Sequence, residues 1–320
     1  MTMNSSYRIA TRGSKLAIIQ TEILTRNLRK LDSSLKCDII KIKSSGDINK
    51  NKLLFSVNEK GVFEKEVDRV VLEERADFAV HSIKDIPTEL DDELVIASIL
   101  KRESPNDVLI GKSKLNLEQL EPNSYVGTSS LRRAVQIKRK NPNVKVIPIR
   151  GNVESRVRKC INGQFDALVL AEAGLRRLDM SDLIVQRFNC LDFIPAPGQG
   201  AIGIVCRKDN KKILSILQAI EDRPTRFAID AERSLIRHLN AGCRFPVGAI
   251  AIPNLRTKRI VLHASVFSAD GSQSIKGKKS DVITNSSHIG RELANDLLAR
   301  GAADFAKEWR HALEKWNSQK

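Results

Sequence analysis

The sequence predicts an α/β protein with two lobes, followed by a small α+β domain at its carboxyl end. Short apolar runs alternate with amphipathic helical patterns over the first 220 residues, which is typical of strands alternating with helices. The Pro- and Gly-rich stretch Ile194–Gly200 interrupts this alternation and is interpreted as a hinge or crossover. After Pro224 the pattern changes to one helix, a group of alternating strands and a last helix. At about 150 residues per domain, 320 residues suit two or three domains.

The first lobe is predicted to begin with a strand at Tyr7–Thr11, followed by a helix whose apolar residues recur at helical spacing. Ser14 precedes that helix and is a candidate N-cap. The strands are expected to pair largely in parallel, because helices separate them along the chain. The other elements expected here are a strand at Asp38–Lys43, an amphipathic helix marked by Phe63, Val67, Val70 and Val71, and buried strands at Phe78–His81 and Leu94–Leu100.

The second lobe contains two predicted helices with clear stop signals, Asn141-Pro142 after the first and Asn162-Gly163 after the second. No repeat at the level of the sequence relates this lobe to the first. The expected elements are strands at Tyr125–Gly127, Val144–Ile149 and Ala167–Ala171, and helices at Leu131–Lys140 and Val153–Ile161.

The last part of the chain is expected to form the α+β domain. Its predicted elements are a helix at Thr225–Leu239, antiparallel strands at Ala249–Ile252, Ile260–Phe267 and Ser272–Lys278, and a final helix over Ile289–Glu314. The predicted domains are therefore 1–105 together with 200–220, then 106–199, then 221–320. The Lys-rich polar residues 44–60 are interpreted as a mobile loop.

Composition narrows the classes of function. A formal net charge of +16 indicates an anionic partner, which is a nucleic acid, a membrane surface or a small polyanion. Aromatic residues make up 4% of the chain, which argues against gripping single strands by base stacking. The five cysteines and five histidines lack metal-binding spacings, so no metal site is expected and a reducing compartment is indicated. With no signal-like start and no window of roughly 18 apolar residues, a cytoplasmic protein is expected.

Basic residues concentrate between Thr128 and Lys159, where ten Lys and Arg residues face a single acidic residue, Glu154. Arg132 and Arg133 fall in the first turn of a predicted helix, where a positive charge opposes the helix dipole. That position is explained if guanidinium groups, hydroxyls and the helix N-terminus converge on an anion.

The simpler interpretation of a basic run is a solvated face that attracts nucleic acid, and it is kept for Lys138-Arg139-Lys140. Carboxylate or phosphate binding is favoured for Arg132, Arg133, Arg150 and Arg156. These four lie at strand-to-helix junctions, which form the ligand-binding edge of open α/β sheets. Arginine also suits bidentate recognition of carboxylates better than lysine does.

A second polar group, Ser82, Lys84 and Asp85, follows the buried strand that ends at His81. Asp85 is a candidate general acid/base, or a partner for a cationic intermediate. The alternative is a structural Lys84–Asp85 ion pair that closes the turn before Pro87. His81 on its own is more often a satisfied core histidine than a ligand.

Cys243 lies in a loop after a predicted helix, where Gly242 gives flexibility and Arg244 favours the thiolate. The alternative is a buried and inert cysteine, as assumed for the other four. No His or Asn lies nearby in the sequence, so a protease-type nucleophile is not indicated.

Seven strings, taken in order, resemble the porphobilinogen deaminase (hydroxymethylbilane synthase) family of tetrapyrrole and haem biosynthesis. The similarity runs from about Arg8 to Lys307. Each string is weak alone, but seven in order with family-like spacing are specific. The strings are RIATRGS at 8–14, KGVF at 60–63, VHSIKDIP at 80–87, VGTSSLRR at 126–133, IRGNVESR at 149–156, APGQGAIGI at 196–204 and AGCRFPVG at 241–248.

The resemblance implies two lobes like those of periplasmic binding proteins and a third, α+β domain that carries Cys243. It further implies that Cys243 forms a thioether to a dipyrromethane cofactor made from the substrate itself. Four porphobilinogens are then added one at a time with loss of ammonia, and water releases the linear hydroxymethylbilane. Each pyrrole carries an acetate and a propionate, so the growing chain needs a basic, arginine-lined cleft.

The resemblance also implies roles for particular residues. Asp85, in the matching K-D-x-P motif, is the implied catalytic carboxylate, which stabilises cations through pyrrole N–H groups. The residues implied to bind the cofactor are Ser82, Lys84, Asp85, Thr128, Ser129, Ser130, Arg132, Arg133, Asn152 and Gln199. The residues implied to bind the incoming substrate are Arg12, Ser14, Arg150, Arg156 and Arg177.

Two other classes of protein fit part of the pattern. A non-enzymatic two-lobed binding protein for a small polyanion explains the arginines, but it needs neither Cys243 nor Asp85. A nucleic-acid binder explains the charge and predicts steep salt dependence, but no helix-turn-helix or aromatic platform is evident. We therefore expect a cytoplasmic, monomeric enzyme with porphobilinogen as its substrate and with no nucleic-acid or membrane partner. A transient hand-over of the linear product to the next pathway enzyme is also expected, because ring closure needs a second enzyme.

Overall fold

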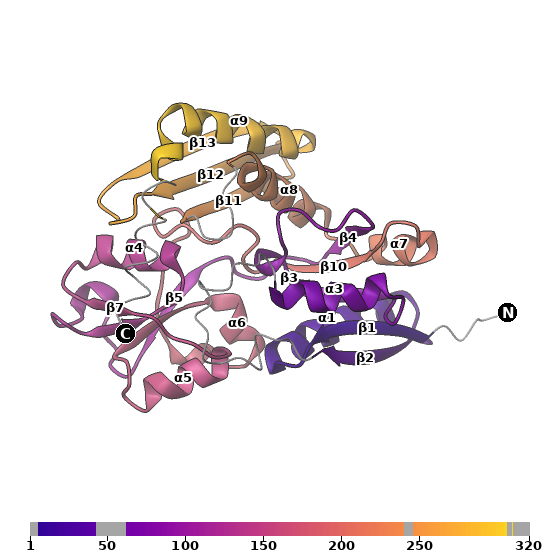
Figure 1. The fold of residues 1–320 in the computed structure, drawn as a ribbon, viewed down its shortest axis with the longest axis horizontal. Helices are drawn as coiled ribbons and strands as arrows, with labels where there is room; N and C mark the ends of the chain where they lie inside the picture. Colours follow the sequence, from indigo (N-terminus) through magenta and orange to yellow (C-terminus); the bar gives the residue numbers. More distant parts are fainter. Residues whose placement is uncertain (1–5, 43–61, 240–245, 306–308, 310–320) are drawn as a thin grey trace. The chain divides into compact units, whose positions relative to one another are not determined.

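The structure is a computed structural model that describes residues 6–42, 62–239, 246–305 and 309 (Figure 1). These residues divide into two compact units. Unit 1 comprises 6–42, 62–103 and 201–226, and unit 2 comprises 104–200, 227–239, 246–305 and 309. The chain therefore passes from one unit to the other after Glu103, after Gly200 and after Arg226. Within the described ranges, no helix has the length and apolar content that crossing a lipid bilayer requires.

Unit 1 is built on a five-stranded sheet in the order β2-β1-β3-β10-β4. Strands β2, β1 and β3 are parallel, whereas β10 runs antiparallel to both of its neighbours. The main elements are β1 (Ser6–Arg12), β2 (Lys36–Ile42), β3 (Phe78–Ser82), β4 (Leu94–Ile99), β10 (Ile202–Arg207), α1 (Lys15–Leu31), α3 (Val62–Leu72) and α7 (Lys211–Gln218).

The core of unit 1 is apolar because the helices turn their buried faces to the sheet. Leu24 and Leu28 of α1 pack with Ile9, Phe78 and Ile204 of the strands. The helix α1 begins where the sequence predicts it, since the Oγ of Ser14 accepts a hydrogen bond from the N–H of Ala17 at 3.3 Å. The predicted N-cap is confirmed.

The first sheet of unit 2 has five strands in the order β7-β6-β8-β5-β9. Strands β7, β6 and β8 are parallel, and β5 runs antiparallel to β8 and β9. The main elements are β5 (Asp107–Gly111), β6 (Tyr125–Gly127), α4 (Leu131–Lys140), β7 (Lys145–Ile147), α5 (Val153–Ile161), β8 (Ala167–Ala171), α6 (Glu172–Arg177) and β9 (Ile184–Arg187).

The two five-stranded sheets share one strand order, although the sequence shows no repeat. Each has three parallel strands and, beside them, an antiparallel strand that is the first strand after a crossing between the units. That strand is β10 in unit 1 and β5 in unit 2. The expectation of largely parallel pairing is therefore wrong for two of the four pairs of neighbouring strands in each sheet. A strand that arrives without a preceding crossover helix in its own sheet is free to pair antiparallel.

The second sheet of unit 2 has three antiparallel strands in the order β11-β12-β13, and the α+β grouping predicted after Pro224 is confirmed. Helices α8 and α9 pack against it through Leu235, Leu293 and Leu297. The elements are α8 (Arg223–His238), β11 (Val247–Asn254), β12 (Arg259–Phe267), β13 (Ser274–Val282) and α9 (Ser286–Ala299).

The final helix is shorter than expected. Helix α9 ends at Ala299, and Gly301 has a φ of +94°, which a helix cannot contain. Residues 302–305 are helical again. The remainder of the predicted Ile289–Glu314 helix lies largely outside the described residues.

Inside unit 2 the residues Ile194–Gly200, here called the strap, join the two sheets. The N–H of Ala249 in β11 donates to the carbonyl of Pro195 at 3.0 Å. A Cβ atom added at Gly248 would lie 2.2 Å from Ile194, so only glycine permits this approach. The Oε2 of Glu232 in α8 also accepts from the N–H of Gly198 at 2.6 Å. The division into three domains stays a prediction, and both sheets of unit 2 belong to one compact unit.

Candidate functional site

The candidate residues of unit 1 gather at one edge of its sheet. Because β1 and β3 are parallel neighbours, their carboxyl ends meet at the same edge. Arg12 ends β1, and Ser82 ends β3. Lys84 and Asp85 follow in a short 3-10 turn and are exposed. The structure thus brings together the residues that the sequence assigned to this lobe.

The turn that carries Asp85 is fixed by its neighbours. The Nε2 of Gln20 in α1 donates to the Oγ of Ser82 at 2.8 Å. The N–H of Ile83 donates to the carbonyl of Ala201 at 3.0 Å. A Cβ at Gly203 of β10 would lie 2.3 Å from the Cδ1 of Ile83, so the glycine lets the turn sit against the strand.

The strand before the turn is held by a buried pair. The Nε2 of His81 lies 2.8 Å from the Oδ1 of Asp68 in α3, and both side chains are buried. The interpretation of His81 as a satisfied core histidine is therefore confirmed. The pair joins α3 to the strand that presents Ser82 and Asp85.

The candidate residues of unit 2 also gather at one edge. Strands β7, β6 and β8 are parallel, so their carboxyl ends face the same way. Three predicted groups follow these ends: residues 128–133 after β6, residues 150–156 after β7, and Arg177 in the helix after β8.

Hydroxyl groups organise the segment between β6 and α4. The Oγ1 of Thr128 accepts from the N–H of Ser130 at 3.2 Å, and the Oγ of Ser130 caps α4 by accepting from the N–H of Arg133 at 3.4 Å. The Oγ of Ser129 donates to the carbonyl of Ile149 at 2.5 Å and accepts from its N–H at 3.1 Å. These bonds join the segment to the residue before Arg150.

The next junction is ordered in a similar way. The Oδ1 of Asn152 caps α5 by accepting from the N–H of Ser155 at 2.9 Å. The Nε of Arg156 donates to the carbonyl of Gly151 at 2.7 Å. Arg150 is partly buried, and that burial lowers its pKa. A partly desolvated guanidinium binds an anion more strongly than a fully hydrated one.

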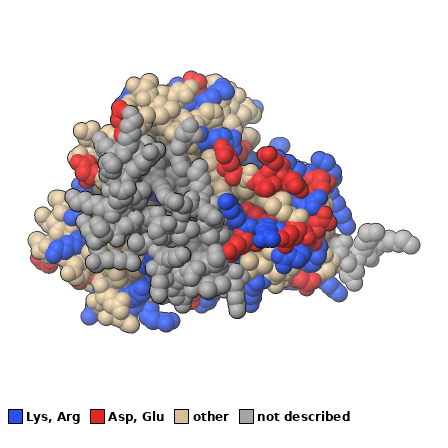
Figure 2. All heavy atoms as spheres, viewed as in Figure 1, with Lys and Arg blue, Asp and Glu red and all other residues tan. Residues whose placement is uncertain are grey.

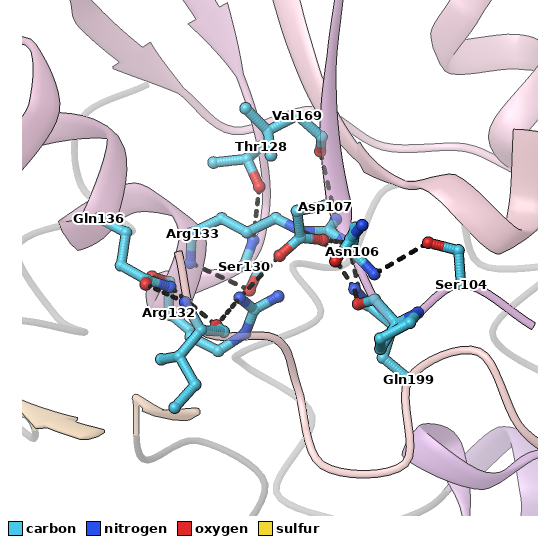
Figure 3. A network of polar contacts seen from close by, with 12 residues as sticks. Ser104, Asn106, Asp107, Thr128, Ser130, Arg132, Arg133, Gln136, Val169 and Gln199 are labelled. Atoms are coloured by element: carbon cyan, nitrogen blue, oxygen red, sulfur yellow. Dashed lines mark hydrogen bonds and ion pairs between the residues drawn. The ribbon is translucent and has the colours of Figure 1, made fainter. Parts of the chain in front are cut away.

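Four residues of unit 2 form a buried polar group, here called the guanidinium cluster: Asp107, Arg132, Arg133 and Gln199 (Figure 3). The Oδ2 of Asp107 pairs with the Nη1 of Arg132 at 2.8 Å. Its Oδ1 pairs with the Nη2 of Arg133 at 2.8 Å and accepts from the Nε2 of Gln199 at 2.9 Å. One carboxylate therefore orients two guanidinium groups and an amide.

The cluster also forms hydrogen bonds to the backbone where the chain enters this part of unit 2 and where it leaves it. The Nε2 of Gln199 donates to the carbonyl of Pro105 at 2.8 Å, and the Nη1 of Arg132 donates to Ile194 in the strap at 2.6 Å. Arg177 donates from Nη2 to the carbonyl of Gly200 at 2.7 Å. Gln199 thus has a structural role in addition to the one that the resemblance implies.

The electrostatics of the cluster favour a charged carboxylate. Burial alone would raise the pKa of Asp107, but Arg132 and Arg133 more than offset this and lower it to about 2. The same burial lowers the pKa of Arg132, although Asp107 opposes that shift. Asp107 is therefore ionised at neutral pH.

Asp107 and Gln20 are the residues of the site that the sequence did not single out. Asp107 lies outside the basic stretch Thr128–Lys159, and only the antiparallel pairing of β5 with β8 brings it to this edge. A lone acidic residue at the start of an otherwise apolar strand, DVLIG, was the available signal. Gln20 gave no signal beyond being polar on the apolar side of a predicted helix.

The basic run Lys138–Lys140 is only partly a solvated face. Lys138 and Arg139 are exposed, as that interpretation requires. Arg139 nevertheless donates from Nη1 to the carbonyl of Gly271 at 2.9 Å, and Lys140 pairs with Glu118 at 3.3 Å.

On the face shown in Figure 2, acidic and basic side chains are interspersed over the region where Figure 1 draws α7, β4 and α3. No continuous basic surface covers that part of the view.

Cys243 lies outside the described residues, so the structure gives no geometry for it. Within the described ranges, no group of three or more His, Cys, Asp or Glu side chains is placed to hold a metal ion.

The fold and the two sheet edges define a two-unit α/β protein whose strand ends carry arginines suited to carboxylates. Residues 7–215 match the family model described as "Porphobilinogen deaminase, dipyromethane cofactor binding domain". Residues 227–299 match the model described as "Porphobilinogen deaminase, C-terminal domain". The chain belongs to the porphobilinogen deaminase family.

Curated relatives agree with this assignment. The chain is 44% identical to the probable porphobilinogen deaminase of Nitrosopumilus maritimus (strain SCM1), over 97% of this chain and 99% of the relative. It is 40% identical to the porphobilinogen deaminase of Desulforudis audaxviator (strain MP104C), over 95% and 97%. Among solved structures, it is similar to a putative methionine-binding lipoprotein from Bacillus subtilis subsp. subtilis str. 168, with a TM-score of 0.44 and 10% identity over 67% of this chain and 89% of that chain.

The residues of unit 2 fit the cofactor that the family model names. Dipyrromethane carries carboxylate side chains, and Arg132 has donors to offer them. In the described part of the chain, the hydrogen bonds and ion pairs of its guanidinium use Nη1 alone, so the Nε and Nη2 groups are left for an added acceptor. Guanidinium donors held by a buried carboxylate are preorganised for such a ligand.

Proposed function

We propose that the chain is a transferase that joins four molecules of porphobilinogen head to tail, with loss of ammonia at each addition. Addition of water then releases linear hydroxymethylbilane. The observation that carries the proposal is the guanidinium cluster, which lies at the carboxyl edge of parallel strands and within the residues that match the cofactor-binding domain. Each pyrrole carries an acetate and a propionate, and paired arginines suit such polyanions.

The proposed cofactor is a dipyrromethane attached covalently through Cys243. When bound, it supplies the free pyrrole carbon at which the chain grows. In unit 2, Thr128, Ser129, Ser130, Arg132, Arg133, Asn152 and Gln199 bind its carboxylates or support the groups that do. In unit 1, Ser82, Lys84 and Asp85 take part. Residues Arg12, Ser14, Arg150, Arg156 and Arg177 bind the carboxylates of the incoming porphobilinogen.

Asp85 is the proposed catalytic residue. It is exposed on a turn that Gln20, Ala201 and Gly203 hold in place. A carboxylate fixed there accepts hydrogen bonds from pyrrole N–H groups and stabilises the positive charge that develops when porphobilinogen loses ammonia. The same carboxylate takes the proton that leaves the pyrrole α-carbon after coupling.

The remaining proposals concern the setting of the enzyme. It acts as a monomer in the cytoplasm, without a nucleic-acid or membrane partner. Because the product is linear, the next reaction must close the ring, and the product passes to that enzyme by transient contact.

The deciding experiment is the intact mass of the purified protein beside a Cys243→Ser variant. The proposal expects a mass excess of two linked pyrroles in the parent and none in the variant, with further discrete increments when porphobilinogen is added. A parent chain without added mass, which porphobilinogen leaves unchanged, would contradict the proposal and favour a non-enzymatic binding protein. Asp85→Asn should keep the cofactor mass and lose most of the turnover, and normal turnover in that variant would remove Asp85 from the catalytic role.

A further inference from the structure

We propose that Asp107 is a positioning residue that sets the charge of the guanidinium cluster, so that the cluster retains one surplus positive charge and recruits one carboxylate of the cofactor through Arg132. This inference rests on the proposed function and deepens it. Asp107 does not touch the ligand; it acts through the two arginines that it orients.

The first support is the charge balance of a buried group. Asp107 is 0% exposed, Arg132 5% and Arg133 7%. One carboxylate faces two guanidinium groups, and in the described residues no other protein carboxylate pairs with either arginine. A buried charge without a counterion is costly, so an arrangement with one surplus cation favours the entry of an anion.

The second support is the distribution of donors. Each nitrogen of the Arg133 guanidinium already has a hydrogen-bond partner. Its Nε donates to Asp107 at 3.0 Å, its Nη1 to the carbonyl of Val169 at 3.2 Å, and its Nη2 to Gln199 at 3.3 Å. Arg132 uses only Nη1 within the described part of the chain. The surplus charge is therefore available at Arg132, whereas Arg133 serves to hold Asp107 and Gln199.

A second buried carboxylate of unit 2 shows that this arrangement is not a general feature of ion pairs here. Glu172 is 1% exposed and also pairs with two arginines, Arg176 at 2.9 Å and Arg187 at 2.8 Å. Those arginine side chains are 45% and 54% exposed, so water solvates the surplus charge. Glu172 therefore provides a matched control with the same burial and the same two-arginine pairing.

The test compares two single variants and their double variant, which change the net charge of the cluster in steps. The measured quantity is the fraction of purified chains that carry the cofactor mass. With Asp107 ionised, the parent cluster has one surplus positive charge. Asp107→Asn raises the surplus to two, Arg133→Gln lowers it to zero, and the double variant restores one. We expect each single variant to reduce the loaded fraction by about tenfold or more. Arg133→Gln removes the surplus charge, and Asp107→Asn removes the carboxylate that orients the two guanidinium groups and offsets their mutual repulsion. We expect the double variant to be loaded more fully than Arg133→Gln alone.

The control, Glu172→Gln, should lose thermal stability but keep the parent's loaded fraction. A purely structural role for Asp107 predicts the opposite pattern: loading follows thermal stability in every variant, and the double variant is loaded no better than Arg133→Gln. That result would overturn the inference. If Asp107→Asn does not fold, the comparison of Arg133→Gln with the double variant still decides, and a double variant that fails to fold contradicts the proposal.

The same measurement separates this inference from the proposed function. A parent chain without the mass of two linked pyrroles contradicts the proposed function itself, together with the inference that rests on it. A loaded parent with a double variant no better than Arg133→Gln contradicts only the role given to Asp107.

Discussion

The hydroxyl of Ser129 bonds twice to the backbone of Ile149, donating to its carbonyl at 2.5 Å and accepting from its N–H at 3.1 Å. Two strand-to-helix junctions, each carrying arginines, are thereby held at a fixed separation. The single hydroxyl spans twenty positions in sequence and joins the segment before Arg132 to the segment that begins with Arg150.

We expect Ser129→Ala to lower the free energy of unfolding by about 1–2 kcal/mol, because a partly buried carbonyl and N–H lose their partner. The KM for porphobilinogen should rise several-fold while kcat changes less, since Arg150, one of the proposed substrate-binding arginines, loses its fixed position relative to Arg132 and Arg133. Urea unfolding and steady-state kinetics measure both quantities. Ser113→Ala, at an exposed position of the same unit, is the control and should change neither. Equal kinetics in the two variants would show that the bond is not needed for binding.

Gln20→Ala should reduce kcat and leave the cofactor mass in place. The Nε2 of Gln20 holds the Oγ of Ser82, three residues before the proposed catalytic carboxylate. Without it the turn that carries Asp85 loses one of its anchors, and misplacement of a catalytic group slows chemistry more than it weakens binding. Asn27→Ala is the control on the same helix, because the Nδ2 of Asn27 donates to the carbonyl of Ile23 within α1 itself. A kcat that falls equally in both variants would point to a general effect on α1.

Asp107 should make the free energy of unfolding of the protein decrease at acidic pH. Its pKa in the folded chain is about 2, below the ordinary value of 3.8. A lowered carboxyl pKa stabilises the fold above the unfolded value, and this contribution is lost as the pH falls from about 4 toward 2. The difference corresponds to about 2 kcal/mol.

Urea unfolding between pH 5 and pH 2 tests this dependence. Asp107→Asn should be less stable than the parent near neutral pH, and the gap should narrow as the pH falls. Asp192→Asn, at an exposed position, serves as the control and should follow the parent across the range. A gap between Asp107→Asn and the parent that stays constant with pH would show that the carboxylate charge is not what stabilises the fold.

Gly203→Ala should destabilise unit 1 and disturb the turn that carries Asp85. The added Cβ would lie 2.3 Å from the Cδ1 of Ile83 and 3.1 Å from that of Ile86, so the turn must shift. Overpacking of this kind costs about 1–3 kcal/mol. Ile83→Val removes the Cδ1 atom that clashes, so the double variant should recover much of the thermal midpoint and of kcat. Failure of Ile83→Val to rescue either quantity would place the damage elsewhere in β10.

Much of the fold could be predicted from local patterns. Several elements, among them Leu131–Lys140 and Val153–Ile161, have the predicted bounds, because helical spacing and Asn-Pro or Asn-Gly stop signals are local. The direction of β10 and β5 could not be predicted, because pairing depends on a segment that arrives from another unit. The last helix ends earlier than predicted because Gly301 has a positive φ, which interrupts the helical pattern that continues beyond it.

The site divides in the same way. Arg132, Arg133 and Asp85 could be singled out because each follows a predicted strand, and strand ends are where ligands bind in such sheets. Asp107 could not be singled out, because it lies 26 positions from Arg133 in the sequence. Only non-local strand pairing brings the two residues together. The double bond of Ser129 to Ile149 was likewise hidden, because nothing in a serine-rich turn indicates which backbone group its hydroxyl will meet.

The shared strand order of the two large sheets also constrains the order of events during synthesis on the ribosome. The strands β5 to β9 form one continuous stretch, so the first sheet of unit 2 is complete once that stretch has emerged. The sheet of unit 1 begins earlier, yet β3 and β4 are joined only through β10, whose last residue is Arg207. The sheet of unit 1, whose first strands are synthesised earlier, is therefore completed after the first sheet of unit 2. Until β10 arrives, β3 presents an unpaired edge, which is the kind of surface that chaperones protect in nascent chains.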